Sequence, residues 1–414
     1  MDLFFYSEMA NIMKNKKSVI VSNKYSGRWI KIPLQCYEII EKLSEEGASI
    51  SLSEELFENK EDKKYFDEMV AMLDKMDLIA DEPSKKVYYG MIPSVSFAIT
   101  NKCNLNCCYC CKESDIYKKE NLSLDELKKA MDNIIKLKPI NISISGGEPL
   151  IRKDFKEFIE YTKEIYDGKL ILSTNATLID EKMAEFIVKN FHAVEISIDG
   201  YDEETCSEVR GHGVFKKVVD AVGYLKKYGC QKISMSMVMG KYNESYKEKF
   251  EKFNESIGTK GRIRHFCKFG RGFSGCEKYV GDGEVFFTPN DIYDDVTYEN
   301  IKTGHCNAGR NSIFISDEGY IYPCPNITDD CFKVFNILDL NDENEEKLYR
   351  KDFDGIRSFE KLDMQNQEKC RDCSVNAFCN TCPAKNKLLF ENKAAFDKHC
   401  RYTKEHLNRI LWSE

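Results

Sequence analysis

The sequence has no long apolar run, no export signal and no excess of positive charge. No stretch approaches the roughly 18 consecutive apolar residues that a membrane-spanning helix needs, so we expect no membrane partner. The first residues, "MDLFFYSEMANIMKNKK", contain no basic stretch that leads into an apolar run, so we expect no secretory signal and a cytoplasmic location. The formal net charge of -8 argues against binding to nucleic acid, because phosphate binding depends on clustered Lys and Arg.

Cysteine, in contrast, is abundant: the chain of 414 residues contains 18 of them. In a protein that is not exported, so many cysteines are metal ligands more often than disulfide partners. Hydrophobic residues make up 42% and charged residues 31%, which is typical of a soluble globular protein. A chain of this length exceeds one small core, so we expect two or three domains.

Residues 1–85 are predicted to form a first domain of mixed α and β structure. "SVIVSN" (18–23) and "GRWIKIP" (27–33) have the composition of two strands around a turn, and apolar residues recur at helical spacing in "LQCYEIIEKL" and "KKYFDEMVAMLDKMDLI". "SLSE" (51–54) fits a capping box at the start of a short helix. Short strands with three helices are typical of a winged helix-turn-helix-like domain, with "DEPSKK" (81–86) as the linker.

A winged helix suggests two kinds of partner. Acidic side chains outnumber basic ones in residues 1–85, and the helix "LQCYEIIEKL" carries one Lys and two Glu, which argues against DNA. The exposed edge of a strand beside a helix can instead bind an extended peptide as an additional strand. We therefore expect this domain to recognise a peptide and not nucleic acid.

The sequence from residue 90 to residue 280 predicts an α/β domain. Six strand-like segments alternate with helical stretches, which is typical of a parallel sheet that curves into a partial (β/α)6 TIM-like barrel. In such barrels the active site lies at the C-terminal ends of the strands. "NKCNLNCCYC", "GGEP", "TNA" and "DG" follow the first four strands, so we expect them to meet at that edge. The expected strands are 94–100, 140–145, 169–174, 193–199, 232–239 and 262–268, and the expected helices lie near 122–137, 153–166, 179–189, 214–228 and 243–256.

The cysteines after the first strand predict an iron–sulfur site. Cys103, Cys107 and Cys110 are spaced C-x3-C-x2-C, and three thiolates on one loop can hold three irons of a [4Fe–4S] cluster and leave the fourth open. A zinc site is the alternative interpretation of this spacing. With "GGEP" (146–149) at the next strand end, the region 93–270 resembles the radical SAM superfamily.

The resemblance implies a bound S-adenosylmethionine, chelated at the open iron and cleaved by one electron to methionine and a 5′-deoxyadenosyl radical. Cys103, Cys107 and Cys110 would be the catalytic cluster ligands, whereas Cys108 and Cys111 fall outside the spacing and should tolerate Ser or Ala. The resemblance also implies a set of contacts to S-adenosylmethionine. These are Tyr109 near the adenine, Gly146, Gly147 and Glu148 at the methionine amino group, Ser173 and Asn175 after the third strand, Ser197 and Asp199 near the ribose, and Arg210 at the methionine carboxylate.

A second cysteine group lies in residues 285–414, where the regular alternation stops. Residues 311–325 predict a hairpin with its turn at 317–319. The pattern C-x12-G-x4-C, then C-x2-C-x5-C-x2-C and a final Cys, resembles the seven-cysteine SPASM extension, with one spacer a residue short. The resemblance implies an irregular domain with two auxiliary [4Fe–4S] clusters, three clusters in all. The implied ligands are Cys370, Cys373, Cys379 and Cys400 for an outer cluster, and Cys306, Cys324 and Cys382 for an inner one.

The inner cluster is one ligand short on this assignment. Cys331, Cys276 or Cys267 is a candidate fourth ligand. Alternatively, the iron is open and binds a substrate thiolate, since iron clusters favour soft sulfur ligands. A disulfide interpretation of these cysteines conflicts with the cytoplasmic location that we expect.

The order of the three parts implies a function. It resembles peptide maturases of the sactipeptide, ranthipeptide and streptide types, in which an N-terminal RiPP recognition element binds the leader of a ribosomally made precursor peptide. We predict that the chain crosslinks such a peptide through thioether bonds, with electrons from a donor such as flavodoxin or ferredoxin. Carbon–carbon crosslinking is the first alternative.

Two further alternatives belong to other classes. One is an anaerobic sulfatase-maturating enzyme, which Pro325 disfavours because that family carries an acidic residue at this position. The other is a regulator that senses redox state through its clusters and binds DNA through the winged helix. A basic recognition helix would favour the regulator, and the helix in this chain is not basic.

Overall fold

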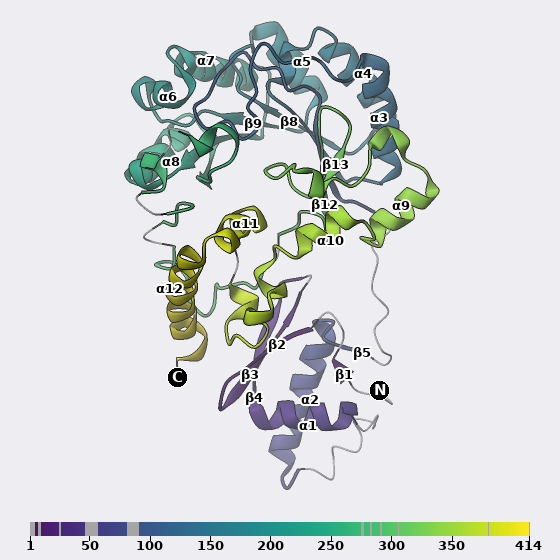
Figure 1. Ribbon diagram of the computed structural model, residues 1–414, viewed down its shortest axis with the longest axis vertical. Coiled ribbons are helices and arrows are strands. Elements are labelled where there is room, and N and C mark those ends of the chain that lie inside the picture. Colours follow the sequence, from purple (N-terminus) through teal and green to yellow (C-terminus); the bar gives the residue numbers. More distant parts are fainter. Residues whose placement is uncertain are drawn as a thin grey trace.

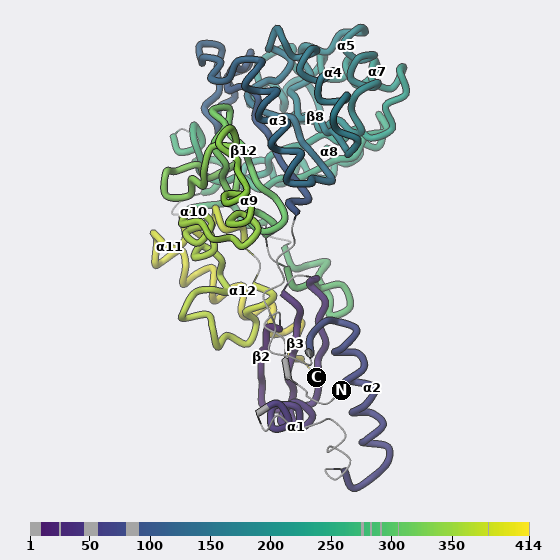
Figure 2. Tube along the Cα trace, turned by 90° about the vertical axis from the view of Figure 1, so that its right-hand side faces the viewer, coloured from purple at the N-terminus to yellow at the C-terminus, as the bar shows by residue number. Residues whose placement is uncertain are grey.

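The structure is a computed structural model that describes residues 5–6, 10–24, 26–45, 57–80, 91–274, 277–281, 284–289, 292–304, 306–379 and 381–413. The predicted capping box at 51–54 and the linker at 81–86 lie outside the described residues. Three parts follow one another along the long axis: the sheet with its helices, the C-terminal region and the N-terminal unit (Figures 1 and 2). None of the described helices is long and apolar enough to cross a membrane.

The largest element is an eight-stranded sheet with the order β11-β10-β9-β8-β7-β6-β12-β13. The six strands from β6 to β11 are parallel to their neighbours, as the sequence predicts for a partial TIM-like barrel. Their bounds are β6 (Ser94–Ala98), β7 (Asn141–Ser145), β8 (Lys169–Thr174), β9 (Ala193–Ser197), β10 (Ile233–Met239) and β11 (Lys260–His265).

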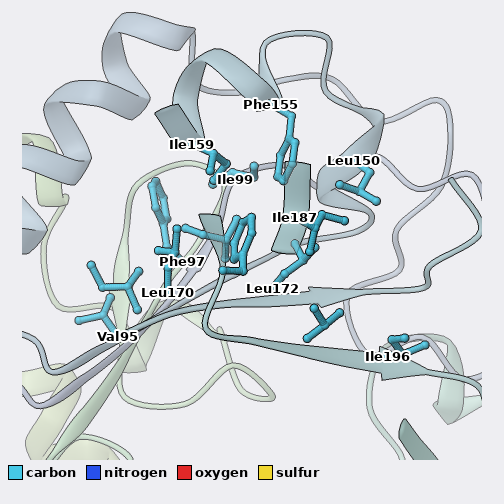
Figure 3. Close-up of a cluster of buried hydrophobic side chains, with 14 of the residues drawn as sticks. Val95, Phe97, Ile99, Leu150, Phe155, Ile159, Leu170, Leu172, Ile187 and Ile196 are labelled. Carbon is cyan, nitrogen blue, oxygen red and sulfur yellow. The ribbon is translucent and has the colours of Figure 1, made fainter. Parts of the chain in front are cut away.

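Helices cover one face of this sheet (Figure 1). Buried side chains alternate along the strands and pack against the apolar faces of the helices, as Phe97, Ile159 and Leu172 do in Figure 3. Ser123 and Glu126 form a capping box that begins the first of these helices. The helices are α3 (Leu124–Lys136), α4 (Phe155–Ile165), α5 (Glu181–Asn190), α6 (Glu203–Arg210), α7 (Val214–Lys227) and α8 (Lys247–Ser256).

The structure departs from the predicted alternation in two places. Helix α6 was not expected; its N-cap Asp202 and Thr205 form a short capping box directly after β9. After β11, the described residues form 3-10 turns, η4 (Gly270–Phe273) and η5 (Glu277–Tyr279), where a sixth barrel helix would stand. The five helices that the sequence predicts all precede β11 and are all present, as α3, α4, α5, α7 and α8.

The predicted hairpin is present, but it belongs to the barrel sheet. β12 (Ser312–Ile315) pairs in parallel with β6, and β13 (Ile321–Tyr322) pairs antiparallel with β12. Its turn contains Gly319 at φ +84°, a backbone conformation that favours glycine. The region that we predicted as a separate domain from residue 285 thus extends the sheet on the β6 side.

The rest of the C-terminal region consists of helices and short turns. Helices α11 and α12 close the chain, and the dense cysteine segment lies before α11. The elements are η6 (Asp330–Phe332), η7 (Ile337–Asp339), α9 (Asp342–Tyr349), α10 (Asp354–Glu360), η8 (Met364–Asn366), η9 (Glu368–Cys370), η10 (Asn376–Phe378), α11 (Pro383–Glu391) and α12 (Lys393–Trp412).

The N-terminal unit has a three-stranded antiparallel sheet with the order β2-β3-β4. Alternate residues of its middle strand face opposite sides: Val19 and Val21 pack on the two helices of the unit, whereas Ile20 packs on the C-terminal region. Its elements are β1 (Phe5–Tyr6), β2 (Ala10–Lys14), β3 (Ser18–Asn23), β4 (Trp29–Pro33), α1 (Leu34–Glu45), α2 (Lys60–Lys75) and β5 (Ile79–Ala80).

This unit docks through the second face of its sheet. Ile20 is 0% exposed because Ile301, Leu407 and Leu411 cover it. Trp29 donates from Nε1 to the carbonyl oxygen of Ile301 at 3.0 Å and meets Phe378 and Tyr298 edge-to-face. The N-terminal unit is therefore attached beside η10, within the cysteine-rich segment.

Replacing Trp29 with Ala is expected to weaken this docking by about 2–4 kcal/mol, because one hydrogen bond and two aromatic contacts are lost. Hydrogen exchange of the amides around Ile301 and Leu411 should become faster, while the barrel amides stay protected. The control is Tyr65→Ala, at a position on α2 that is 50% exposed. It should change neither the exchange around Ile301 and Leu411 nor the exchange of the barrel amides. Unchanged exchange around Ile301 in Trp29→Ala would contradict the docking role.

Candidate functional site

The three cysteines of the first motif lie together on the loop after β6. Backbone bonds shape this loop: Cys103 N–H donates to the Asp115 carbonyl at 2.9 Å, and Cys110 N–H donates to the Cys107 carbonyl at 3.3 Å. The pKa of the Cys103 thiol is raised to about 11, mainly by burial, and the nearby thiols of Cys107 and Cys110 contribute to this rise. The structure therefore brings the three predicted ligands into one group.

The "GGEP" loop after β7 packs on the beginning of the cysteine loop. Gly147 N–H donates to the Thr100 carbonyl at 2.9 Å, and Glu148 N–H donates to the Lys102 carbonyl at 2.8 Å. A Cβ at Gly147 would lie 2.2 Å from the Lys102 carbonyl oxygen, and a Cβ at Gly146 would lie 2.3 Å from that of Thr100. The two glycines are thus needed because the "GGEP" loop packs directly on the cysteine loop. The sequence did not indicate this contact between the two loops.

Gly147→Ala is expected to destabilise the protein by about 3 kcal/mol or more, because the added methyl group meets backbone that cannot move aside. The matched control is Gly223→Ala in the exposed surface of α7, where an added Cβ meets nothing within 4 Å. That control should gain about 0.5–1 kcal/mol from helix propensity. Chemical denaturation of both variants checks the difference, and similar stabilities would contradict the close approach at Gly147.

Glu148 is completely buried and holds two strand ends together. Its carboxylate accepts from Thr174 Oγ1 at 2.8 Å, from Asn175 N–H at 2.7 Å and from Leu150 N–H at 3.1 Å. Burial raises the pKa of this carboxyl group, whereas the three hydrogen bonds lower it. Asn175 then donates from Nδ2 towards Cys103 Sγ at 3.8 Å. Glu148 therefore positions the residues that surround the first cysteine.

Asp199 and Arg210 form a buried ion pair at the same edge of the sheet. Arg210 Nη2 and Nε lie 2.5 and 2.8 Å from Asp199 Oδ2, and Val238 N–H donates to Asp199 Oδ1 at 2.6 Å. Burial alone would lower the pKa of Arg210, but Asp199 and the nearby Cys107 and Tyr109 raise it above its ordinary value. Arg210 Nη1 makes no hydrogen bond within the described residues, which leaves it for a carboxylate from outside.

Tyr109 lies on the other side of this ion pair, in an aromatic pocket. Its ring meets those of Phe266 and Tyr279 edge-to-face, with Met239 in the same hydrophobic cluster. The Tyr109 hydroxyl is buried and has no hydrogen-bond partner in the part of the chain that the structure describes. Burial and the carboxylate of Asp199 raise its pKa well above the ordinary value. Buried hydroxyl groups normally form a hydrogen bond, so this hydroxyl is suited to a ligand that brings a hydrogen-bonding group into the pocket.

Ser173 and Ser197 lie at the C-terminal ends of β8 and β9. The hydroxyl of Ser173 is 3.3 Å from that of Ser143 and donates to Glu195 Oε2 at 3.5 Å. Ser197 faces the same side two residues after Glu195. Neither hydroxyl hydrogen-bonds to the cysteine loop among the described residues. Their contact with S-adenosylmethionine remains a prediction.

The concave face carries charged residues that the sequence analysis missed. Arg262 Nη1 lies 3.0 Å from Glu195 Oε1, and Arg264 Nη2 lies 3.9 Å from Glu195 Oε2. The two arginine side chains stay 50% and 59% exposed, so they face an open space. The sequence contained a signal for this pair, the alternation in "RIRH". Residues two apart on a strand share one face, so Arg262 and Arg264 point to the same side. A polar concave face with an excess of positive charge is suited to a polar or acidic ligand.

The C-terminal cysteines gather in two groups, as predicted. Cys370, Cys373, Cys379 and Cys400 line one cavity of about 20 Å³, together with His399. Cys324 is buried, and the thiols of Cys382 and Cys306 lie close enough to raise its pKa further. Cys276 lies outside the described residues.

The surroundings of the thiols fit iron–sulfur clusters. Three predicted ligands each accept a hydrogen bond from the backbone N–H two residues later: Cys103 from Leu105, Cys306 from Ala308 and Cys324 from Asn326. Donors directed at sulfur stabilise a thiolate and tune a bound cluster. No three His, Cys, Asp or Glu side chains among the described residues converge closely enough to hold a single ion.

Comparison with known proteins agrees with this geometry. Residues 97–253 match the profile of the radical SAM superfamily. The chain therefore contains a radical SAM domain, which implies a [4Fe–4S] cluster and S-adenosylmethionine.

Among curated relatives, the mycofactocin maturase MftC of Mycolicibacterium smegmatis is 26% identical over 265 residues, which are 59% of this chain and 67% of that protein. A probable GTP 3′,8-cyclase of Archaeoglobus fulgidus is 27% identical over 267 residues, which are 58% of this chain and 88% of that protein. Sequence similarity thus connects the chain to radical SAM proteins with different reactions.

Two solved structures resemble the fold over most of the chain. The native anSMEcpe with bound AdoMet has a TM-score of 0.53 and 19% identity, and the match covers 77% of this chain and 100% of that one. SuiB of Streptococcus suis bound to S-adenosylmethionine has a TM-score of 0.53 and 16% identity, and this match covers 94% of this chain and 97% of that one. At these identities the likeness concerns the fold alone. A match over 94% of the chain includes the N-terminal unit.

Proposed function

We propose that this chain is a radical SAM peptide maturase that crosslinks a ribosomally made precursor peptide. One observation carries the proposal: the three-cysteine loop, the "GGEP" loop and the Asp199–Arg210 pair meet at one edge of a half-open barrel, beside a polar concave face and a second cysteine group. The fold likeness to SuiB over 94% of the chain and the sequence similarity to a mycofactocin maturase support a peptide substrate.

Each part of the site has a role in this proposal. Cys103, Cys107 and Cys110 hold the cluster. Arg210 Nη1 and the Tyr109 hydroxyl, which have no hydrogen-bond partner in the described part of the chain, bind S-adenosylmethionine. The chemistry that such a cluster would supply there is the electron for reductive cleavage of S-adenosylmethionine to methionine and a 5′-deoxyadenosyl radical. The half-open barrel encloses the reacting atoms and keeps water away from the radical.

The N-terminal unit is proposed to bind the leader of the peptide. Among the described residues, its sheet ends at β2 and β4, and either edge strand offers backbone groups for an additional strand. Lys31 of β4 donates to the Leu411 carbonyl at 3.0 Å, so this edge lies beside the end of α12. A leader bound here would deliver the following residues towards the cysteine-rich region and the barrel. The electron donor in this proposal is a low-potential protein such as flavodoxin or ferredoxin.

The proposed bond is a thioether between a cysteine sulfur and a carbon of the peptide. One C–H and one S–H bond break and one C–S bond forms, so the peptide loses two hydrogens. The 5′-deoxyadenosyl group takes one hydrogen atom, a base takes one proton, and one electron passes to an auxiliary cluster. Carbon–carbon crosslinking is the second candidate. It breaks two C–H bonds and forms one C–C bond, so the peptide again loses two hydrogens and one electron again passes on.

Asp317 is the candidate base for the proton. It lines a cavity of about 90 Å³ together with Lys112, Gly146 and Pro325, so this cavity lies between the "GGEP" loop and the inner cysteine group. Asn121 Nδ2 donates to its carboxylate at 2.7 Å. Burial raises the pKa of Asp317, while Asn121 and Lys112 lower it. Its carboxylate lies in the same cavity as Pro325, the position that is acidic in sulfatase-maturating enzymes.

Asp317→Asn is expected to slow crosslinking by about 100-fold, the range of a lost general base. Formation of 5′-deoxyadenosine should continue, so the ratio of 5′-deoxyadenosine to crosslinked peptide should rise. The adjacent Glu318→Gln, at an exposed position, is the control and should keep the original ratio. If Asp317→Asn lowers both products equally, Asp317 does not act as the base.

The whole proposal is tested by co-expression with a candidate precursor peptide from a neighbouring reading frame. Mass spectrometry should show loss of two hydrogens for each crosslink. Fragmentation should then place the bond at a cysteine for a thioether, or between two carbons for the second candidate. The purified, cluster-loaded chain should also form 5′-deoxyadenosine with S-adenosylmethionine and dithionite; its absence would reject the enzymatic proposal.

A further inference from the structure

The inner cysteine group contains a fourth thiol that comes from the barrel. Cys267 lies two residues after the end of β11 and packs between two hydrophobic clusters, one with Cys324 and Cys382 and one with Cys370, Cys379 and Cys400. Of these thiols, those of Cys382 and Cys324 are the ones that act electrostatically on Cys267. The pKa of its thiol is raised to about 12, mainly by burial; the cation of Lys385 opposes this rise, and the thiols of Cys382 and Cys324 add to it. Cys267 therefore lies within electrostatic range of two of the three inner ligands.

The other two candidates have weaker positions. Cys331 is exposed on η6 and does not belong to the hydrophobic cluster that contains Cys324 and Cys382. Cys276 lies outside the described residues. The outer group already has four cysteines around its own cavity, so Cys267 is not needed there.

The chain holds Cys267 in place through several backbone contacts. Cys267 pairs with Phe286 in an isolated antiparallel bridge, and its carbonyl accepts from Phe269 N–H at 3.0 Å. Lys385 donates to the Phe287 carbonyl at 3.4 Å, which keeps a positive charge beside the thiol. A nearby cation favours a thiolate and a negatively charged cluster.

The same segment also holds the first cysteine loop. Arg271 N–H donates to the Cys110 carbonyl at 3.1 Å, and Arg271 Nε donates to the Cys107 carbonyl at 3.0 Å. A Cβ at Gly270, which has φ +50°, would lie 2.6 Å from the Cys110 carbonyl oxygen. Cys267 therefore lies only one short segment, 267–271, away from the side chain that fixes the radical SAM cysteine loop.

We infer that Cys267 is the fourth ligand of the inner auxiliary cluster, together with Cys306, Cys324 and Cys382. This inference rests on the proposed function only in assigning those three cysteines to a cluster. When the cluster is assembled, the S–H bond of Cys267 is replaced by an Fe–S bond and the proton passes to solvent. A cluster with four protein thiolates has no open iron.

The assignment restricts how the crosslink can form. A substrate thiolate could bind this cluster only by displacing Cys267, so the inner cluster serves to carry electrons and not to hold the peptide. The segment from Cys267 to Arg271 then gives a short path between the two sites. This arrangement favours carbon–carbon crosslinking or a thioether formed by a thiol that iron does not hold.

The experiment compares Cys267→Ala, Cys267→Ser and Cys331→Ala in a chain whose Cys103, Cys107 and Cys110 are all Ala. That background removes the open iron of the radical SAM cluster, so only the auxiliary clusters respond. After anaerobic reconstitution, iron is counted and the reduced clusters are followed by electron paramagnetic resonance with and without added 2-mercaptoethanol. The background and Cys331→Ala should hold about eight irons and show no response to the thiol.

Cys267→Ala should either respond to 2-mercaptoethanol, because its iron is open, or fall to about four irons, because the inner cluster is lost. Cys267→Ser should keep about eight irons with an altered signal, because a serine oxygen replaces the sulfur. A response in the background itself, or one that appears only in Cys331→Ala, would overturn the inference. Product analysis of the chain with all its cysteines is separate, so failure to crosslink any peptide would reject the proposed function and leave this result standing.

Discussion

Cys107→Ala is expected to abolish cleavage of S-adenosylmethionine. Cys107 lies in one group with Cys103 and Cys110, next to the Asp199–Arg210 pair. Two remaining thiols cannot hold the cluster that leaves one iron open, so the electron for the cleavage is not supplied. Iron should fall from about twelve to about eight per chain, and 5′-deoxyadenosine should drop below detection.

The matched control is Cys108→Ala, at the adjacent position. Cys108 is exposed and falls outside the spacing of the three ligands, so iron content and 5′-deoxyadenosine should stay at the original level. Cys111 is a second comparison: it has an exposed surface, but protein surrounds its thiol, and burial together with Cys110 raises the thiol pKa. If Cys108→Ala and Cys107→Ala lose iron equally, the assignment of ligands by spacing is wrong.

Arg210→Gln is expected to weaken binding of S-adenosylmethionine by about 10- to 100-fold. A charge-assisted hydrogen bond to a carboxylate contributes about 1.5–3 kcal/mol, which corresponds to this range. The variant should also lose about 3–5 kcal/mol of stability, because Asp199 is left as a buried charge without its partner. Equilibrium binding and chemical denaturation measure the two effects separately.

A double variant separates the binding role from the structural role. Asp199→Asn together with Arg210→Gln removes both charges, so stability should return close to that of the original chain. Affinity for S-adenosylmethionine should still be about tenfold or more below that of Asp199→Asn alone. If the double variant binds as tightly as Asp199→Asn, Arg210 acts only by neutralising Asp199, and its proposed contact with the methionine carboxylate is rejected.

Much of the barrel could be predicted because its signals are local. Short apolar strands with small turn residues, alternating with helices of 3.6-residue periodicity, indicate a parallel sheet without knowledge of distant contacts. Helix α6 was missed because it is short and its polar sequence, "EETCSEVR", has no apolar stripe. The sequence signal for this helix was the capping pair Asp202 and Thr205. A capping pair indicates a helix less strongly than apolar periodicity does.

The position of the hairpin, in contrast, could not be predicted from local sequence patterns. Its strands and its turn at Gly319 are visible in the sequence, but its pairing with β6 joins residues more than 200 positions apart. The docking of Ile20 on Leu407 likewise depends on a face of the sheet that local pattern cannot assign to a partner. Such contacts form only when the whole chain is compact.

The sequence by itself determined the chemistry: the spacing of Cys103, Cys107 and Cys110 and the "GGEP" motif are enough to indicate a radical SAM site. Ligands that share one loop can be recognised from their spacing along the chain. Only the tertiary structure decided that Asp199 pairs with Arg210, that Gly147 packs on Lys102, and that Cys267 lies with the inner cysteines. These contacts join loops and helix ends that the folding of the sheet brings together, and no local segment encodes which of them meet.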